Sequence, residues 1–84
     1  MGSASREKPR RLAEKLLEIR TRLNLSQKEM LHRLGASEKL TRMDISKYER
    51  GIREPSLLTL LDYARVINIS TDILIDDNAN LPFR

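Results

Sequence analysis

Several residue types and patterns are missing from this sequence of 84 residues. It has no cysteine, which excludes disulfides, thiolate zinc sites and cysteine nucleophiles. No stretch approaches the roughly 20 consecutive apolar residues of a membrane span, and the N-terminus lacks the apolar run of a signal peptide. The length allows one small domain with a single core, but not an elaborate pocket. We therefore expect a soluble protein with no membrane partner and no small-molecule effector.

Residues that carry out catalysis are also scarce. His32 is the only histidine, and no carboxylate or cysteine partner is evident for it, so we expect a solvated surface residue. No histidine is paired with a plausible nucleophile and no glycine-rich phosphate loop is present, which argues against an enzyme. Asp72, Asp76 and Asp77 form an acidic cluster without the spaced loop of a calcium site, so helix capping and solubility explain it better. We expect neither a metal nor a cofactor.

Charge is distributed unevenly along the chain. Residues 1–53 hold 14 Lys and Arg against 7 Asp and Glu, whereas residues 54–84 hold 2 against 5. The two parts therefore carry +7 and −3, within a net charge of +4. One end of the domain should be electropositive, and such a field attracts a polyanion, although a basic helical face is also found as plain solvated surface.

Apolar residues at helical spacing mark the first two helices. Across residues 10–23 they recur at intervals of four, three and four, which is the stripe of an amphipathic helix, and Pro9 suits its first turn. A second helix should follow Ser26, because its hydroxyl and the carboxylate of Glu29 have the spacing of a capping box. Gly35 is suited to ending that helix.

Residues 35–46, GASEKLTRMDIS, repeat this capping pattern. Thr41 is the expected N-cap of a third helix, and Asp44 is its partner in the box. An earlier start at Ser37 is disfavoured, because the positions that would extend the apolar stripe backwards are all polar. We therefore predict a loop over residues 36–40 and a helix from Thr41.

Two more helices follow the third, which should end at Gly51. Ser56 is placed to cap a fourth helix over residues 57–67, the most apolar of the set. Ser70 is placed to cap a short fifth helix that ends near Asp76. No segment alternates as a half-buried strand does, so the predicted fold class is all-α, with about five helices joined by short connections.

The predicted domain organisation has three parts. We expect residues 1–8 to be a disordered N-terminal arm or a tag remnant, residues 9–76 to form the helical domain, and residues 77–84 to be a C-terminal tail. Leu81 and Phe83 make this tail apolar enough to fold back on the domain or to dock on a second copy, and disorder is the third alternative.

The predicted third helix has a polar outer face. If Ile45 points to the core, steps of about 100° per residue turn four other side chains inward. These are Thr41, Tyr48, Glu49 and Ile52. The remaining positions carry long cationic and polar side chains, as a helix in the major groove of DNA requires, although an ordinary amphipathic surface helix has the same pattern. The outward residues are Met43, Lys47 and Arg50, with Arg42, Asp44 and Ser46 on the flanks.

Glu49 is a carboxylate on the inward side of this helix. Burying it without a cation would be costly, so we expect a basic partner. Arg20, near the end of the first helix, is the main candidate and Arg22 is the alternative. If Glu49 instead lies at the rim of the core, it stays hydrated.

These features resemble the Cro/C1-type helix-turn-helix family of DNA-binding regulators, also called the XRE family. The resemblance rests on the segment LSQKEMLHRLG, followed by ISKYERGIREPSLLTLLDYARVINIS, and runs from about Arg11 to Ile75. It implies a lambda-repressor-like domain of five helices, in which the second and third form the helix-turn-helix. It also implies transcriptional repression or activation at operator DNA.

The resemblance implies roles for individual residues. Gln27 would contact a phosphate and brace the recognition helix, and Arg20 would pair with Glu49. Backbone amides from about Arg53 to Leu57 would donate to phosphate, and Ser56, at a helix N-terminus, fits anion binding on independent grounds. The base-reading positions would be Arg42, Met43 and Lys47, with Asp44 or Ser46 close to the DNA backbone. Apart from the resemblance, we also expect Thr41 and Arg50 among the DNA-binding residues.

The chain departs from the family pattern in the turn. Nine residues separate Gly35 from Ile45, where the usual pattern has about five. Lys39 and Ser37 lie where an elongated turn can reach phosphate, while Glu38 would be repelled there. We predict a contact with the DNA backbone from Lys39.

Together, the sequence predicts a sequence-specific, double-stranded DNA-binding transcriptional regulator whose helix at about residues 41–50 enters the major groove. It should bind as a homodimer on a palindromic operator, in the prokaryotic cytoplasm at the nucleoid. The alternative is a protein-interaction module on the same fold, such as an antitoxin or an assembly adaptor.

Overall fold

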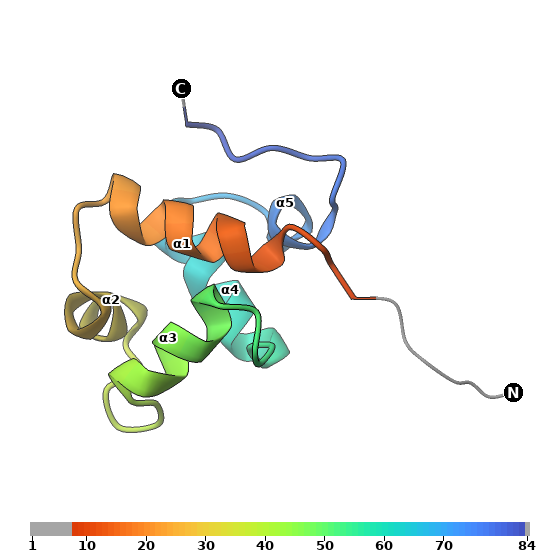
Figure 1. Cartoon of the computed structure of the whole chain (residues 1–84). Coiled ribbons are helices and arrows are strands. Elements are labelled where there is room, and N and C mark those ends of the chain that lie inside the picture. The colour runs from red at the N-terminus through yellow and green to blue at the C-terminus, as the bar shows by residue number, and fades with distance from the viewer. Residues whose placement is uncertain (1–7, 84) are drawn as a thin grey trace, which may run out of the picture.

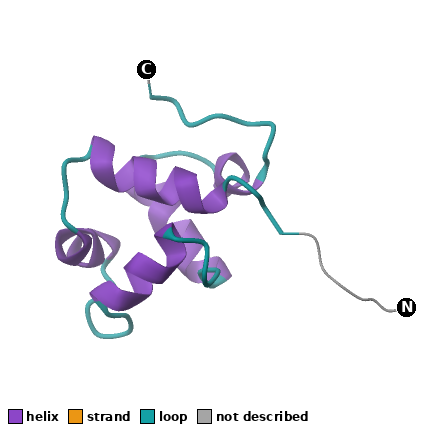
Figure 2. Ribbon diagram, in the orientation of Figure 1, coloured by secondary structure: helices purple, strands orange, loops and turns teal. Residues whose placement is uncertain are grey.

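The computed structural model describes residues 8–83, and within them it contains five helices and no strand (Figure 1). The helices are α1 (Leu12–Arg22), α2 (Gln27–Leu34), α3 (Arg42–Glu49), α4 (Leu57–Val66) and α5 (Thr71–Ile75). Figure 2 shows them joined by loops, with the C-terminal tail running back along α1. The predicted all-α class with five helices is confirmed. The predicted N-terminal arm, apart from Lys8, lies outside the described residues.

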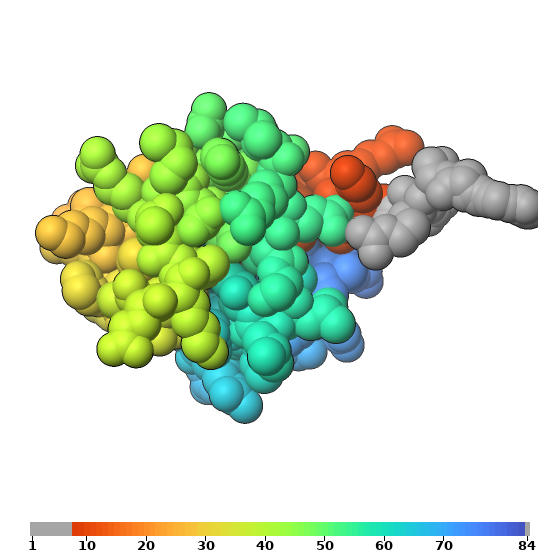
Figure 3. Space-filling view, turned by 90° about the horizontal axis from the view of Figure 1, so that it is seen from below, coloured from red at the N-terminus to blue at the C-terminus, as the bar shows by residue number. Residues whose placement is uncertain are grey.

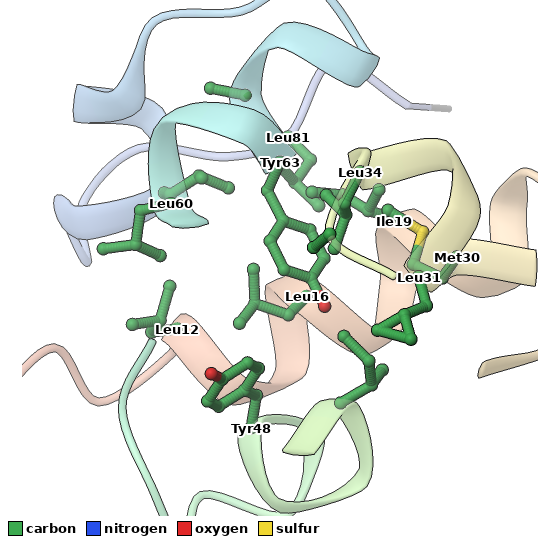
Figure 4. Close-up of a cluster of buried hydrophobic side chains, with 14 residues drawn as sticks. Leu12, Leu16, Ile19, Met30, Leu31, Leu34, Tyr48, Leu60, Tyr63 and Leu81 are labelled. Atoms are coloured by element: carbon green, nitrogen blue, oxygen red, sulfur yellow. The ribbon is translucent and has the colours of Figure 1, made fainter. Parts of the chain in front are cut away.

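The core forms where α1 and α2 pack against α3 and α4, with α5 closing the side next to α1. In Figure 4 the Tyr63 ring of α4 points toward Leu16 of α1, at the centre of the cluster. Both side chains are fully buried, as are Ile19, Met30 and Ile45. Burial of each large apolar side chain contributes about 1.5–3 kcal/mol, which makes this cluster the main source of stability. No helix within the described residues is long and apolar enough to cross a membrane.

Both predicted capping boxes are present. The Ser26 hydroxyl accepts from the Glu29 amide at 3.0 Å, and the Glu29 carboxylate accepts from the Ser26 amide at 2.7 Å. Thr41 and Asp44 make the same reciprocal pair, at 3.3 and 2.9 Å. The third helix therefore begins after Thr41 and not at Ser37, as predicted, because these bonds satisfy amides that the first helical turn leaves without partners.

The predicted start of the first helix was two residues too early. α1 begins at Leu12, and Pro9 lies outside it. Just before this start, the Asp77 carboxylate accepts from the backbone amides of Arg10 at 2.9 Å and of Arg11 at 3.0 Å. The N-terminal end of α1 is thus capped by a residue 66 positions away, so the capping role expected of the acidic cluster is fulfilled on another helix.

The C-terminal tail folds back on the domain. Leu81 is buried, and the Arg22 guanidinium lies 5.0 Å from the centre of the Phe83 ring. The Arg11 guanidinium donates to the backbone carbonyls of Asp77 at 2.8 Å and of Ala79 at 3.1 Å. Of the three alternatives for the tail, folding back on the same chain is the one observed, and residues 77–83 cover α1.

Lys15 was not predicted to be buried, yet its side chain is 1% exposed. Its ammonium donates to the backbone carbonyls of Ile73 at 2.7 Å and Asp76 at 2.8 Å, at the C-terminal end of α5. Loss of hydration lowers the pKa of this ammonium, and the nearby Arg11 adds to that effect. The charge is tolerated because the last carbonyls of a helix carry partial negative charge and lack intrahelical donors.

The Asp77 cap predicts a pH dependence. Hydrogen bonds from the Arg10 and Arg11 amides hold the pKa of Asp77 below its ordinary value near 3.8. Because the folded-state pKa is the lower one, this contribution to stability is present above about pH 4 and is lost as the pH falls through the folded-state pKa. We expect Asp77→Asn to be less stable than the parent near neutral pH, with the difference shrinking below pH 4. Urea unfolding midpoints measured from about pH 7 to 2.5 check this, and a constant difference would contradict it.

Candidate nucleic-acid interface

α3 lies across one face of the molecule with its outer side open. Ile45 and Tyr48 anchor it in the core, at 0% and 3% exposure. Figure 3 shows this face, where the side chains of α3 (green) lie between those of α2 and its following turn (yellow) and the loop that leads to α4 (teal). The protruding element is therefore a helix with flanking loops on both sides.

The outward side of α3 carries the residues that the helical spacing predicted. Met43 is 56% exposed, and Arg42 is also exposed. Lys47 is half-buried. Arg42 and Lys47 have no hydrogen bond or ion pair to any described residue. Arg50 differs, because its Nε donates to the Ser46 hydroxyl at 3.1 Å. The cationic groups free to meet a ligand on this face are thus Arg42 and Lys47.

Asp44 has a role that the sequence did not indicate. Besides its capping box, its Oδ1 accepts from Nη1 of Arg53 at 2.7 Å. The Thr41 amide is the main cause that holds the pKa of Asp44 low, and Arg53 contributes. This pair ties the loop after α3 to the first turn of α3. No local sequence pattern predicts the Asp44–Arg53 pair, because the two residues are nine positions apart and separated by a chain reversal.

A buried ion pair holds α3 against α1. The Arg20 guanidinium donates to the Glu49 carboxylate from Nε at 2.6 Å and from Nη2 at 3.0 Å. The Glu49 side chain is 4% exposed and that of Arg20 is 17% exposed, so Glu49 does not lie at a hydrated rim. The hydrogen bond to Glu49 raises the pKa of Arg20. Arg22, the alternative partner, lies over Phe83 instead.

Two further groups complete this network. Gln27, the first residue of α2, donates from Nε2 to Glu49 at 3.2 Å, and the Leu25 carbonyl accepts from Nη1 of Arg20 at 2.9 Å. Burial is the main cause that raises the pKa of the neighbouring Tyr63 phenol, and Glu49 adds to it. The network therefore fixes α1, α2 and α3 relative to one another, and it places Gln27 where it braces α3.

Two residues expected on the inward side are exposed. Ile52 is 62% exposed, because α3 ends at Glu49 and Gly51, with φ of +71°, reverses the chain before Ile52. Thr41 is exposed because it is the N-cap and has extended backbone angles. Helical angles do not apply to either position, which is why the projection from Ile45 failed there.

The loop after α3 leads to the capped start of α4. Ser56 accepts from the Thr59 amide at 3.2 Å and donates to the Thr59 hydroxyl at 3.0 Å, so its side chain is engaged within the helix. Residues 51–54 of this loop are exposed. In the segment expected to offer backbone amides to phosphate, Arg53, Glu54, Ser56 and Leu57 are exposed, whereas Pro55 is buried and has no amide hydrogen.

The elongated turn is folded. The carbonyl of the buried Ala36 accepts from the amides of Lys39 at 3.0 Å and Leu40 at 2.9 Å. Ser37 contacts Nδ1 of the exposed His32 at 2.9 Å, so the hydroxyl expected to reach phosphate already has a partner within the protein. Lys39 and its neighbour Glu38 are exposed. Within residues 8–83 no group of three His, Asp or Glu residues is arranged to hold a metal ion.

Known proteins resemble this chain in sequence. It is 32% identical over 68 residues to the uncharacterized HTH-type transcriptional regulator YqaE of Bacillus subtilis (strain 168), which covers 81% of this chain and 55% of that protein. The SPbeta prophage-derived HTH-type regulator YonR of the same strain is 39% identical over 62 residues, covering 74% and 54%. ImmR, an HTH-type transcriptional regulator also of that strain, is 34% identical over 64 residues, covering 76% and 47%. The chain thus spans about half the length of these relatives.

Solved structures and a family model identify the fold and the family. The crystal structure of the P22 c2 repressor in complex with a synthetic operator matches with a TM-score of 0.67 at 24% identity, covering 79% of this chain and 94% of that one. This likeness confirms the predicted fold. The model of the helix-turn-helix family matches residues 16–74, which include most of α1 and all of α2, α3 and α4. The resemblance stated from the sequence is confirmed, and the chain belongs to the helix-turn-helix family.

Proposed function

We propose that this chain is a sequence-specific, double-stranded DNA-binding transcriptional regulator that inserts α3 into the major groove. The observation that carries the proposal is the convex outer side of α3, where Lys47 makes no hydrogen bond or ion pair with any described residue and Met43 is 56% exposed. A convex helix with unpaired donors suits a groove lined by base edges. The names of the three relatives as transcriptional regulators support the proposal.

Individual roles follow from the placement of the side chains. Lys47 can donate to guanine O6 and N7, and Met43 can touch a thymine methyl. Ser46 and Arg50 bond to each other beside these positions, and Thr41 and Asp44 shape the first turn of α3. Phosphate contacts are proposed for Gln27 and Ser56 at the two helix N-termini and for the backbone near Arg53. Such a regulator would work at the nucleoid in the prokaryotic cytoplasm.

In vitro selection of duplexes from a random pool, followed by substitution of Lys47, tests this function. We expect the selection to return a palindromic motif. Lys47→Ala should then reduce discrimination between the selected duplex and a scrambled one by about 1–3 kcal/mol, because a base contact is lost. Fluorescence anisotropy titrations of both duplexes measure this. Arg65→Ala, which removes one positive charge from the exposed side of α4, is the matched control. Equal binding of both duplexes by parent and Lys47 variant would refute base reading by α3.

Salt dependence separates DNA binding from the protein-interaction alternative. Affinity for DNA should fall steeply with salt, with a log–log slope of about −0.9 per phosphate contacted. A chain that binds no duplex at any salt concentration would favour a protein-interaction module instead.

We also propose that the chain dimerises on the operator. Three apolar residues of the loop and the start of α4 are exposed, and together we call them the loop–α4 patch: Ile52, Leu57 and Leu58, at 62%, 77% and 71% exposure. An apolar patch of this kind spans a few hundred Å². A stable interface buries about 800 Å² on each partner, so this patch is too small to hold a dimer without DNA.

Removing the loop–α4 patch should therefore affect cooperativity and little else. The double variant Ile52→Ser and Leu58→Ser is expected to lose cooperative binding to a two-half-site duplex, by about 5- to 150-fold, while affinity for a single half-site is unchanged. Because both side chains are exposed, the thermal midpoint should move little. Undiminished cooperativity in this variant would place the dimer contact elsewhere.

A further inference from the structure

The elongated turn borders a cleft on the protein surface. Together with α2 and the start of α3 it lines an open cleft of about 440 Å³. The cavity is lined by Lys28, Leu31, Ser37, Leu40, Thr41 and Arg42. Its shape is maintained by the hydrogen bonds from Lys39 and Leu40 to the Ala36 carbonyl. The floor packs on the core through Leu31, which is 7% exposed, and Leu40.

The charge of this cleft is positive and unopposed. Lys28 of α2 and Arg42 of α3 are both exposed, and neither makes a hydrogen bond or ion pair with a described residue. The cleft lining contains no carboxylate. Arg50 and Arg53 differ, since the first bonds to Ser46 and the second to Asp44. An anion entering the cleft would therefore meet two cations without displacing an internal partner.

The shape of the cleft indicates which anion fits. Base edges lie on the floor of the major groove and are reached by convex surfaces such as the side of α3 that carries Met43 and Lys47. The phosphodiester backbone forms the ridges on either side of the groove, and a ridge fits a concave surface. A phosphate oxygen pair accepts from an ammonium and a guanidinium at once. Arg42, the first residue of α3, lies at the boundary between the cleft and the convex surface.

Resting on the DNA-binding function proposed above, we infer that Lys28 and Arg42 hold one backbone phosphate of the operator in this cleft, so that Arg42 supplies affinity and not base discrimination. The family resemblance implies a base-reading position for Arg42, and Lys28 has no assigned role. The elongated turn has a function in this proposal, since its residues Ser37 and Leu40 provide one wall of the phosphate site.

Salt titrations of a selected duplex and a scrambled duplex test the inference. The double variant Lys28→Ala and Arg42→Ala should lower the magnitude of the log–log salt slope by about 0.9, which corresponds to one phosphate. Each single variant should weaken binding to both duplexes by the same factor, leaving their affinity ratio within about twofold of the parent. Arg42→Lys should retain most of the affinity, because a phosphate accepts from a point charge, whereas a bidentate base contact does not tolerate that exchange.

Three comparisons make the result decisive. Arg65→Ala controls for the removal of a positive charge, and Lys39→Ala reports whether the outer side of the turn also meets the DNA backbone. Lys47→Ala should change the affinity ratio where Arg42→Ala does not.

An altered ratio with an unchanged slope in Arg42→Ala, or an unchanged slope in the double variant, would overturn the phosphate site while leaving DNA binding intact. Failure of the parent chain to bind any duplex would overturn both proposals. Thermal melts verify that each variant is folded.

Discussion

Arg20→Ala is expected to lower the free energy of unfolding by about 3–5 kcal/mol. The substitution removes both guanidinium donors to the Glu49 carboxylate, which is 4% exposed and, among the described residues, would keep Gln27 as its one side-chain partner. It also removes the donor to the Leu25 carbonyl. Small domains have total stabilities of about 5–15 kcal/mol, so this variant should be largely unfolded at modest denaturant concentrations.

Urea unfolding monitored by circular dichroism measures this loss, and two variants serve as controls. Arg22→Ala, whose guanidinium is more exposed, should cost about 1 kcal/mol or less. The double variant Arg20→Met and Glu49→Leu should be more stable than Arg20→Ala alone, because it leaves no unpaired buried charge. If Arg20→Ala and Arg22→Ala lose the same amount, the ion pair does not have the structural role assigned to it.

Lys15→Ala is expected to have the second largest effect, a loss of about 2–4 kcal/mol. The carbonyls of Ile73 and Asp76 lose their donor in a place closed to water, and the space of the aliphatic stem is left unfilled. Lys15→Met should lose less, since it keeps the stem and removes only the hydrogen bonds. Lys28→Ala, at an exposed position of α2, should stay within about 0.5 kcal/mol of the parent. Equal stability of the Lys15 and Lys28 variants, measured by thermal and urea unfolding, would contradict this account.

Arg20 and Lys15 also show why one part of the fold was predictable and another was not. The need of Glu49 for a cation follows from its place on the helical stripe, because a carboxylate facing the core must be paired. Arg20 lies near the end of a helix whose own apolar stripe faces the same core. The sequence was therefore sufficient to name it as the candidate partner of Glu49. Lys15 lies on the same helix, but its partners are backbone carbonyls, which every residue carries, and no residue type distinguishes them in a sequence.

The candidate interface was predicted to a similar extent. The outward residues of α3 follow from helical angles, so Met43 and Lys47 are found where they were expected. The projection failed at Ile52 because the helix ends before it. The pairing of Asp44 with Arg53 and the cleft between Lys28 and Arg42 depend on how loops fold, and loop conformations are not periodic.

The sequence by itself determined the helices, their capped starts and the family. The helices and their capped starts depend on residues within a few positions of one another: a capping box spans four residues, and an apolar stripe repeats every three or four. The family is indicated by the order of residue types in motifs along most of the chain. Only the tertiary structure decided that Asp77 caps α1, that Lys15 closes α5, and that the elongated turn forms a cationic cleft. These contacts join groups as many as 67 residues apart. Their hydrogen bonds form because packing of the whole core brings the two partners within bonding distance, and no short stretch of sequence does so.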